Sequence, residues 1–323
     1  VIEARKILED WLYDFFEIMP TDTDKANALA LVLTPFIRGS VPVVPMCVVN
    51  GLQHGVGKNK FANGIATLYT GKSLIPKTFT TEEEEQRKQL MSIFREGSDF
   101  VCFDETHVVD GKSLAQALTA QTWSDRILGV SQIAEYPNNA TWMSLGNNVR
   151  VEGDCVRRVY QVQLKPTAPN PENRTASDFR HPDFENWTAE VRKDLLVAVL
   201  TVIRGWYAAG KPRPSKEASF GSFEIWESLI RGLLEYAGVE GFLDTQEEFR
   251  GSSSATMEFW IAHLEWLHEK FRENSFTTFE VHDRLMQDQP NSEPPPGMED
   301  LQQRAYTREL GKVYARMQDR FIG

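Results

Sequence analysis

Apolar residues form two kinds of pattern along this chain, one typical of helices and one typical of buried strands. Near the start they recur at helical spacing in two runs, one around Trp11 and one from Ala26 to Phe36, and both runs predict helices. Three later runs are short, continuous and apolar, which is typical of strands buried on both faces: Met46 to Val49, Phe100 to Phe103 and Val159 to Leu164. Helical patterns separate these strands: Lys60 to Tyr69, Thr80 to Phe94 and Ser113 to Ala120. Such an alternation predicts an α/β fold built on a parallel sheet.

A further pair of segments predicts a β-hairpin between the second and third strands. It covers Ile127 to Ile133 and returns through Trp142 to Leu145. Pro137, Asn138 and Asn139 would form its turn, because these residue types favour turns.

From about Phe184 onward the pattern is helical. Two runs predict long helices at 195–207 and 223–236, and the tract Gly251 to Ser254 predicts a linker or loop. Beyond it, three helical stretches and a proline-rich loop predict a small C-terminal module: 259–271, a helix opening at 276–280, the loop 294–297 and 301–316. A winged-helix-like module fits this pattern, and any small helical bundle fits it equally.

These patterns divide the chain into four expected parts. They are an N-terminal helical segment 1–40, an α/β core 41–180, a helical part 181–250 that the family resemblance given below implies is a lid, and the C-terminal module 251–323.

Composition narrows the class of protein. With 323 residues, 41% of them apolar and including 19 Phe and 8 Trp, the chain buries a core. No apolar run approaches the roughly 20 residues that span a bilayer, and the start does not resemble a signal peptide, so we expect no membrane partner. Cys47, Cys102 and Cys155 are far apart and lie in or beside regular segments, which indicates buried thiols in a reducing cytoplasm.

Net charge excludes one mode of nucleic-acid binding. A charge of −11 argues against a protein that coats duplex DNA over its whole surface, because that affinity comes from neutralising phosphates. It is compatible with a ring whose central channel alone is basic. Arginines gathered between Arg126 and Arg158 fit nucleic acid held inside such a channel.

The segment VVNGLQHGVGKNK joins the first predicted strand to a helix through a glycine-rich turn. Backbone N–H groups in such a turn form a cradle for phosphate, and a lysine neutralises the outer phosphates. The strict pattern has glycine where this chain has Leu52, and a hydroxyl residue where it has Asn59. A glycine-rich turn with an exposed lysine is the alternative. The candidate binding residues are His54, Gly55, Val56, Gly57, Lys58, Asn59 and Lys60.

Polar residues lie at the ends of two further predicted strands. Asp104 and Glu105 follow the second strand, at the end where open α/β sheets bind ligands, and they could hold magnesium and polarise a water. Asn147 follows Leu145-Gly146, on a strand that we expect between the other two. Its amide could orient that water, although an Asn-Asn pair also suits a plain turn.

Arg157 and Arg158 stand just before the last strand of the core. An arginine so placed can reach the site of a neighbouring subunit and stabilise transition-state charge. A surface salt-bridge pair is the alternative.

In this order, the motifs resemble the ATPase core of AAA+ helicases, and within them the superfamily 3 and MCM-like helicases of phages and mobile elements. These are often joined to a primase-polymerase. The resemblance extends over most of the chain and includes several further runs: LTPFIRG from Leu33, EEEEQRK from Glu82, LTAQTWSDRILG from Leu118, PENR from Pro171 and GSFEIWESLIRGLLEYAG from Gly221.

The resemblance implies roles for the candidate residues. Lys58 would hold the β- and γ-phosphates of ATP, and Asp104 and Glu105 would be the acidic pair, with Asn59 and Asp104 at Mg²⁺. Asn147 would be the polar sensor. Arg158 would be the finger acting on the next subunit, with Arg157 as second choice.

The same resemblance implies partners. The chain would form a homo-hexameric ring on single-stranded or forked DNA, with the segment from Arg126 through the hairpin near the central channel. Arg126 could equally contact the subunit interface or form a structural salt bridge. The implied function is an ATP-dependent DNA helicase or translocase in phage or mobile-element replication.

Two alternatives remain open. Asn59 favours a nucleotide-gated scaffold that binds ATP and DNA or protein but hydrolyses little, because an amide is a weaker magnesium ligand than the usual hydroxyl arrangement. A defence or signalling ATPase with the same core would bind no nucleic acid.

Overall fold

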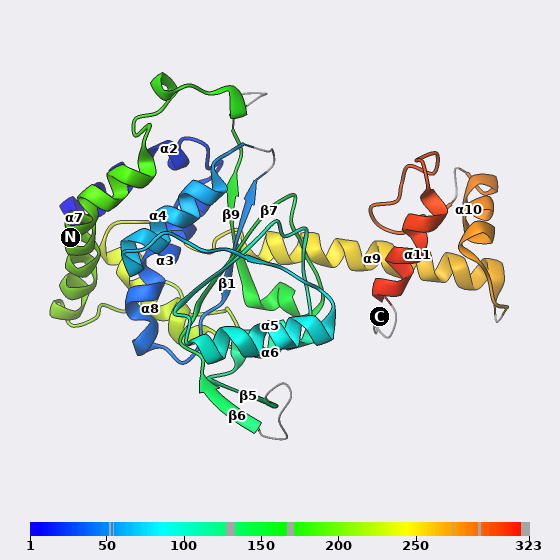
Figure 1. Cartoon of the computed structure of the whole chain (residues 1–323), viewed down its shortest axis with the longest axis horizontal. Coiled ribbons are helices and arrows are strands. Elements are labelled where there is room, and N and C mark those ends of the chain that lie inside the picture. Colours follow the sequence, from blue (N-terminus) through cyan, green and yellow to red (C-terminus); the bar gives the residue numbers. More distant parts are fainter. Residues whose placement is uncertain are drawn as a thin grey trace. The chain divides into compact units, whose positions relative to one another are not determined.

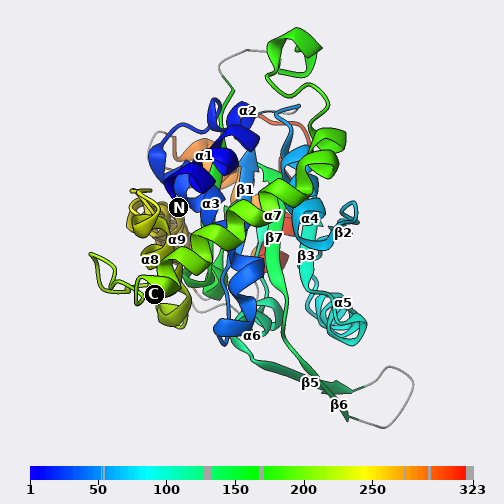
Figure 2. The same ribbon diagram turned by 90° about the vertical axis from the view of Figure 1, so that its left-hand side faces the viewer.

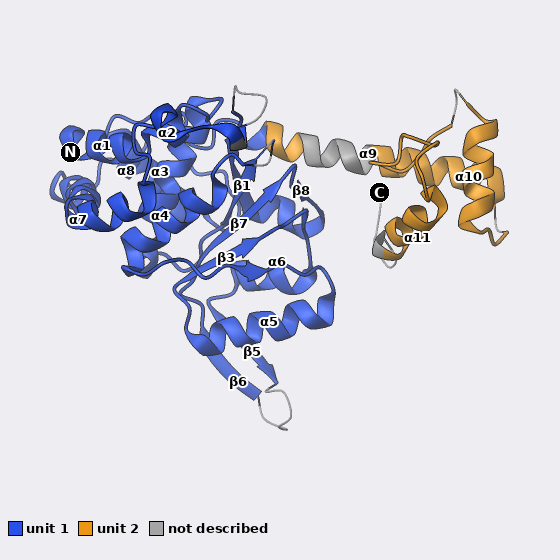
Figure 3. Ribbon diagram, turned by 45° about the horizontal axis from the view of Figure 1, so that its top comes forward, with its two compact units in different colours: residues 1–247 blue, residues 248–323 orange. Residues whose placement is uncertain are grey.

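The structure is a computed structural model, and it describes residues 1–51, 53, 55–126, 133–166, 171–272, 274–289 and 292–317. The chain forms two compact units, Val1–Glu247 and Glu248–Gly323 (Figure 3). The division into four parts stays a prediction.

A five-stranded parallel sheet forms the centre of the first unit (Figure 1). Its strands stand in the order β2 Lys77–Thr78, β3 Phe100–Asp104, β7 Thr141–Asn147, β1 Met46–Gly51 and β9 Val159–Leu164. All six residues of β1 are buried, as continuous apolar strands require. The predicted parallel α/β sheet is therefore confirmed, and the carboxyl ends of β3, β7 and β1 lie at one edge.

Helices cover both faces of this sheet. α3 and α4 lie on one face and α5 and α6 on the other, while α7 crosses outside α1 and α4 (Figures 2 and 3). The predicted helices of this unit are confirmed, with these bounds: α1 Ile2–Trp11, α2 Tyr13–Phe16, α3 Asp22–Ile37, α4 Lys58–Thr70, α5 Glu83–Glu96, α6 Lys112–Thr119, α7 Phe184–Ala208 and α8 Glu224–Tyr236.

Shorter elements connect these helices and strands: the 3-10 helices η1 Arg38–Ser40, η2 Gly153–Arg158, η3 Pro171–Asn173 and η4 Ala176–Asp178, and the paired strands β4 Val108–Val109 and β8 Arg150–Val151.

Aromatic side chains fill the core on each side of the sheet. Trp142 of β7 stacks on Phe103 of β3 at a centroid distance of 6.4 Å and meets Phe94 of α5 at 5.7 Å. On the other side, a Cβ at Gly64 would lie 2.4 Å from Phe184 Cε1, so α4 and α7 approach too closely for any larger residue. The three cysteines are free and buried.

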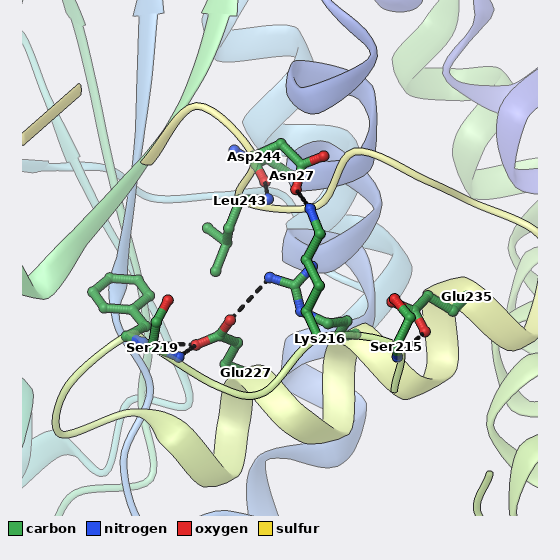
Figure 4. Close-up of polar contacts among 10 residues, drawn as sticks. Asn27, Ser215, Lys216, Ser219, Glu227, Glu235, Leu243 and Asp244 are labelled. Atoms are coloured by element: carbon green, nitrogen blue, oxygen red, sulfur yellow. Dashed lines mark hydrogen bonds and ion pairs between the residues drawn. The ribbon is translucent and has the colours of Figure 1, made fainter. Parts of the chain in front are cut away.

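Acidic side chains hold the segment after α7 to α8 (Figure 4). Glu227 is 1% exposed; it pairs with the buried Arg231 at 2.9 Å and accepts the backbone N–H groups of Ser219 and Phe220 at 2.8 and 2.7 Å. Lys216 Nζ lies 2.6 Å from Asp244 Oδ1. This helical part packs on α3, and its role as a lid stays a prediction.

The β-hairpin was placed wrongly from the sequence. Its strands are β5 Thr122–Arg126 and β6 Ile133–Pro137, which pair antiparallel, and residues 127–132 lie outside the described residues. The segment Trp142–Leu145 instead belongs to β7 in the central sheet. A continuous apolar run fits a strand buried on both faces, whereas β5 alternates exposed and buried residues as a half-buried ribbon does.

Helix α5 supports the hairpin. Trp123 of β5 stacks on Phe94 at 5.5 Å, and Arg87 Nε donates to Asp125 Oδ2 at 2.6 Å. Because a two-stranded ribbon is marginally stable alone, these contacts order it. Both strands extend away from the sheet (Figures 1 and 2).

The second unit is a small helical cluster. Its helices are α9 Gln246–Phe271, which begins in the first unit, α10 Thr278–Gln287 and α11 Tyr306–Met317. Thr277 caps α10 with Glu280 in a reciprocal capping box. The core consists of eight buried residues: Trp266, Leu267, Val281, Leu285, Met298, Leu301, Tyr306 and Leu310. No described residue of this unit lies in a strand, and the winged-helix assignment stays a prediction.

The predicted linker at Gly251–Ser254 is wrong, because this tract lies within α9. One glycine costs a helix about 1 kcal/mol, and serine less, while helix formers flank the tract on both sides. Cooperative propagation from those flanks outweighs the local penalty.

Candidate phosphate-binding site

The loop between β1 and α4 turns into the helix through two glycines. Gly55 and Gly57 have φ of 74° and 92°, a region that glycine adopts without strain. Gly57 is the N-cap residue of α4 and has no side chain that could accept a hydrogen bond from the helix start. The first N–H groups of α4 therefore face the loop, as in anion-binding helix termini. Leu52 and His54 lie outside the described residues.

Lys58 and Asn147 meet above the end of β1. Lys58 Nζ donates a hydrogen bond to Asn147 Oδ1 at 2.5 Å. A Cβ at Gly51 would lie 2.8 Å from that Nζ and 2.9 Å from that Oδ1. A larger residue at position 51 would therefore push the ends of these two side chains aside and disturb their contact. Sequence reasoning missed this role, and the available signal was a glycine at the last position of the strand.

Burial affects the charge of Lys58. Partial burial lowers its pKa below the ordinary lysine value of 10.5, and the negative charge of Asp104 acts in the opposite direction. An additional anion near this amine would stabilise its protonated form.

The acidic pair lies at the neighbouring strand end. Asp104 Oδ2 accepts a hydrogen bond from Asn59 Nδ2 at 2.8 Å, and Asp104 Oδ1 accepts one from the backbone N–H of Glu105 at 2.8 Å. Glu105 is exposed and has φ of 52°, which is uncommon outside glycine. The structure therefore brings together Lys58, Asn59, Asp104 and Asn147 at one edge of the sheet.

Backbone contacts behind the site fix the ends of β3 and β7. A Cβ at Gly146 would lie 1.8 Å from the carbonyl oxygen of Thr106, so only glycine fits there. The N–H of Thr106 donates to the carbonyl of Leu145 at 2.9 Å, and the N–H of Val149 donates to Asn50 Oδ1 at 3.0 Å. The turns that carry Glu105 and Asn147 are consequently joined to each other and to β1.

The donor set fits a magnesium ion that is shared with phosphate. Within the described residues, no group of three or more His, Cys, Asp and Glu could hold a metal by itself. Magnesium beside nucleotides usually takes one or two carboxylates, with phosphate oxygens and waters as the remaining ligands. Asp104 and Glu105 meet that requirement. Asn59 directs its N–H toward Asp104, and its role as a ligand stays a prediction.

A small cavity of about 90 Å³ adjoins the outer side of the loop. Asp14 accepts the backbone N–H groups of Arg180 and His181, both at 2.8 Å, and so fixes the wall opposite Gly57. Sequence reasoning missed these residues, because they come from distant parts of the chain. The lining residues are Asp14, Phe15, Ile18, Gly55, Val56, Gly57, Lys60, Arg174, Phe179, His181, Pro182 and Phe184.

The two candidate finger arginines lie far from Lys58 in the same chain. Both belong to η2, which precedes the amino end of β9, where Val159 pairs with Met46. At about 3.3 Å per residue, six strand residues separate the two edges by about 17 Å. The side chain of Arg157 is 65% exposed and that of Arg158 is 13% exposed, and both contact Asp154.

Basic side chains gather between α5 and the hairpin. They line a cavity of about 290 Å³ that also includes Glu84 and Asp125. Arg87 pairs with Asp125 and lowers its pKa, and Lys88 pairs with Glu84 at 2.9 Å. The four basic residues are Arg87, Lys88, Arg95 and Arg126.

Comparison with known proteins gives little further information. No family model matches the chain, and no curated protein matches it. Two solved structures, both described as the A form apo structure of the NrS-1 C-terminal region, are similar at 12% and 16% identity, with TM-scores of 0.44 and 0.41. They cover 86% and 85% of this chain, and the chain spans 61% of each of them. At these TM-scores the likeness carries no argument about function.

No helix among the described residues is long and apolar enough to cross a membrane.

Proposed function

We propose that this protein is an ATP-dependent DNA helicase or translocase. One observation carries the proposal: at the carboxyl edge of three adjacent parallel strands, Lys58 contacts Asn147 and Asn59 contacts Asp104, beside a helix start whose N-cap residue is glycine. Amide groups, one amine and an acid at such an edge are what binding of a triphosphate requires.

Each residue has a distinct role in this proposal. The N–H groups around Gly55 and Gly57 cradle the phosphates. The amine of Lys58 gives up its hydrogen bond to Asn147 and neutralises the outer phosphates. Asp104 and the phosphate oxygens would hold Mg²⁺, which neutralises charge on the phosphates when bound. The exposed carboxylate of Glu105 accepts a hydrogen bond from the attacking water and orients it.

The placement of Arg157 and Arg158 supports action between subunits. They lie at the opposite edge of the sheet from Lys58, so an arginine from this pair can serve a phosphate site only in another copy of the chain. Arg157 is the more exposed of the two and is the better placed to do so. A homo-hexameric ring, which the AAA+ resemblance implies, satisfies this requirement.

The basic cavity beside the hairpin supports nucleic acid as partner. Arg95 and Arg126 are exposed there, and phosphate backbones bind such side chains through charge. Single-stranded or forked DNA, a phage or mobile-element replication role and a primase-polymerase partner come from the resemblance and are part of the proposal.

A DNA-stimulated ATPase assay tests the proposal. Lys58→Ala and Glu105→Gln should each abolish phosphate release, whereas Lys72→Ala, an exposed lysine just beyond the far end of α4, should leave it unchanged. If activity survives both site substitutions, hydrolysis does not occur at this site.

The second candidate is a nucleotide-gated scaffold with little hydrolysis. The Asn59–Asp104 hydrogen bond favours it, because that contact takes one acceptor position of the carboxylate that would bear the metal. Nucleotide-dependent assembly with negligible phosphate release would support the scaffold over the helicase. A defence or signalling ATPase would be distinguished by the absence of nucleic-acid binding.

A further inference from the structure

Asn59 faces Asp104 with its nitrogen. Its Nδ2 lies 2.8 Å from Asp104 Oδ2, and an ionised carboxylate can only accept hydrogen bonds. The amide oxygen of Asn59 therefore points away from the carboxylate. A metal ion shared by Asn59 and Asp104 would need that oxygen to point toward the carboxylate. Asn59 is exposed, so its side chain is free of packing constraints that would otherwise fix this orientation.

Both oxygens of Asp104 already have a donor. Oδ1 accepts the N–H of Glu105, which belongs to the backbone and cannot turn away without moving the strand end. Oδ2 accepts the amide of Asn59, which is a rotatable side chain. Magnesium coordinates oxygen at about 2.1 Å, closer than the amide nitrogen stands. Each carboxylate oxygen has two lone pairs, so a metal that takes the lone pair directed at Asn59 must displace the amide.

We propose that Asn59 is a positioning residue that competes with the metal ion for Asp104. In the absence of metal its amide donates to the Oδ2 lone pair that faces Asn59, and metal binding at that lone pair breaks the hydrogen bond. The affinity of the site for a divalent cation is therefore lower than it would be without the Asn59–Asp104 hydrogen bond, by the free energy of that bond. This inference rests on the proposed nucleotide site and describes how that site is regulated.

If Asn59 is a metal ligand and not a competitor, its removal should change the metal affinity in the opposite direction. If its amide flipped and the oxygen ligated the metal, removal of the side chain would delete a ligand and weaken metal binding. If it competes as a donor, removal of the side chain strengthens metal binding. A substitution that removes the amide without adding another polar group therefore separates the two roles.

Mn²⁺ titration followed by electron paramagnetic resonance provides the test, because Mn²⁺ prefers the same oxygen ligands as Mg²⁺ and its free signal reports binding directly. The full chain is titrated alone and with a non-hydrolysable ATP analogue. Asn59→Ala should tighten Mn²⁺ binding about five- to tenfold, as loss of one exposed charge-assisted hydrogen bond implies. Asn139→Ala, an exposed asparagine in the loop before β7, should leave the affinity unchanged.

The two proposals fail in different ways. Unchanged or weaker Mn²⁺ binding by Asn59→Ala, in either titration, overturns competition by Asn59. Absence of analogue binding by the unaltered chain, measured by calorimetry with and without Mn²⁺, overturns the nucleotide site. The titration without nucleotide still decides the role of Asn59 in that case.

Discussion

Glu227→Gln should destabilise the first unit strongly. Glu227 is 1% exposed, and its carboxylate meets Arg231, whose side chain is 7% exposed, together with two backbone N–H groups (Figure 4). A glutamine of the same size keeps one oxygen, but its NH₂ group must face a donor. It also leaves the buried guanidinium of Arg231 without a counter-charge.

The stability lost in Glu227→Gln is that of a buried ion pair from which one partner is removed. Removing one partner of a buried ion pair costs about 3–5 kcal/mol, because the remaining charge stays buried and uncompensated. The first unit has 247 residues. At about 2.1 cal/mol/K per residue, its entropy of unfolding is about 0.5 kcal/mol/K, so a loss of about 4 kcal/mol lowers Tm by about 8 °C.

Differential scanning calorimetry measures this shift. Glu224→Gln is the matched control, because Glu224 is exposed on the same helix and its substitution should cost less than about 1 kcal/mol. Adding Arg231→Met to Glu227→Gln should restore much of the loss, since no unpaired charge then remains buried. A Tm change for Glu227→Gln no larger than that of the control would refute the reasoning.

Three further predictions concern the site and the second unit. Gly51→Ala places a methyl group 2.8 Å from Lys58 Nζ, so the ends of Lys58 and Asn147 must shift and ATP binding should weaken modestly, seen by fluorescence of a labelled nucleotide; unchanged affinity would contradict a role for their contact. Because burial lowers the pKa of Lys58, that affinity should fall as pH rises toward 10, and Lys58→Arg should remove the fall. Burial lowers the pKa of His263 below 6.5 in the folded protein. As pH falls below 6.5, His263 is therefore protonated more in the unfolded state than in the folded state, and the free energy of unfolding should decrease. Urea unfolding at pH 7.5 and 5.5 should show that decline in the wild type and not in His263→Gln.

Sequence patterns predicted the sheet and the meeting of its strand ends for one physical reason. Continuous apolar runs such as Phe100–Phe103 have few environments other than a strand buried on both faces. Once such strands are parallel, residues that follow them, including Lys58, Asp104 and Asn147, must gather at one edge. Local pattern and chain direction were sufficient for this part of the site.

Contacts between distant segments explain what the sequence did not predict. The donor orientation of Asn59 depends on the carboxylate of Asp104, 45 positions away. The close contacts at Gly51 arise from two side chains that meet above it. The misplaced hairpin has a different origin, because the continuous burial of Trp142 and its neighbours, which pack against Phe94 and Phe103, distinguishes this central strand from the alternating pattern of a ribbon.

The β5–β6 ribbon is joined to α5 at two points, through the stacked rings of Trp123 and Phe94 and through the Arg87–Asp125 pair. Two separated attachments prevent pivoting about either one. The ribbon and the helix should therefore travel as a single body, so that any rotation of α5 is amplified at the ribbon's outer end in proportion to its length.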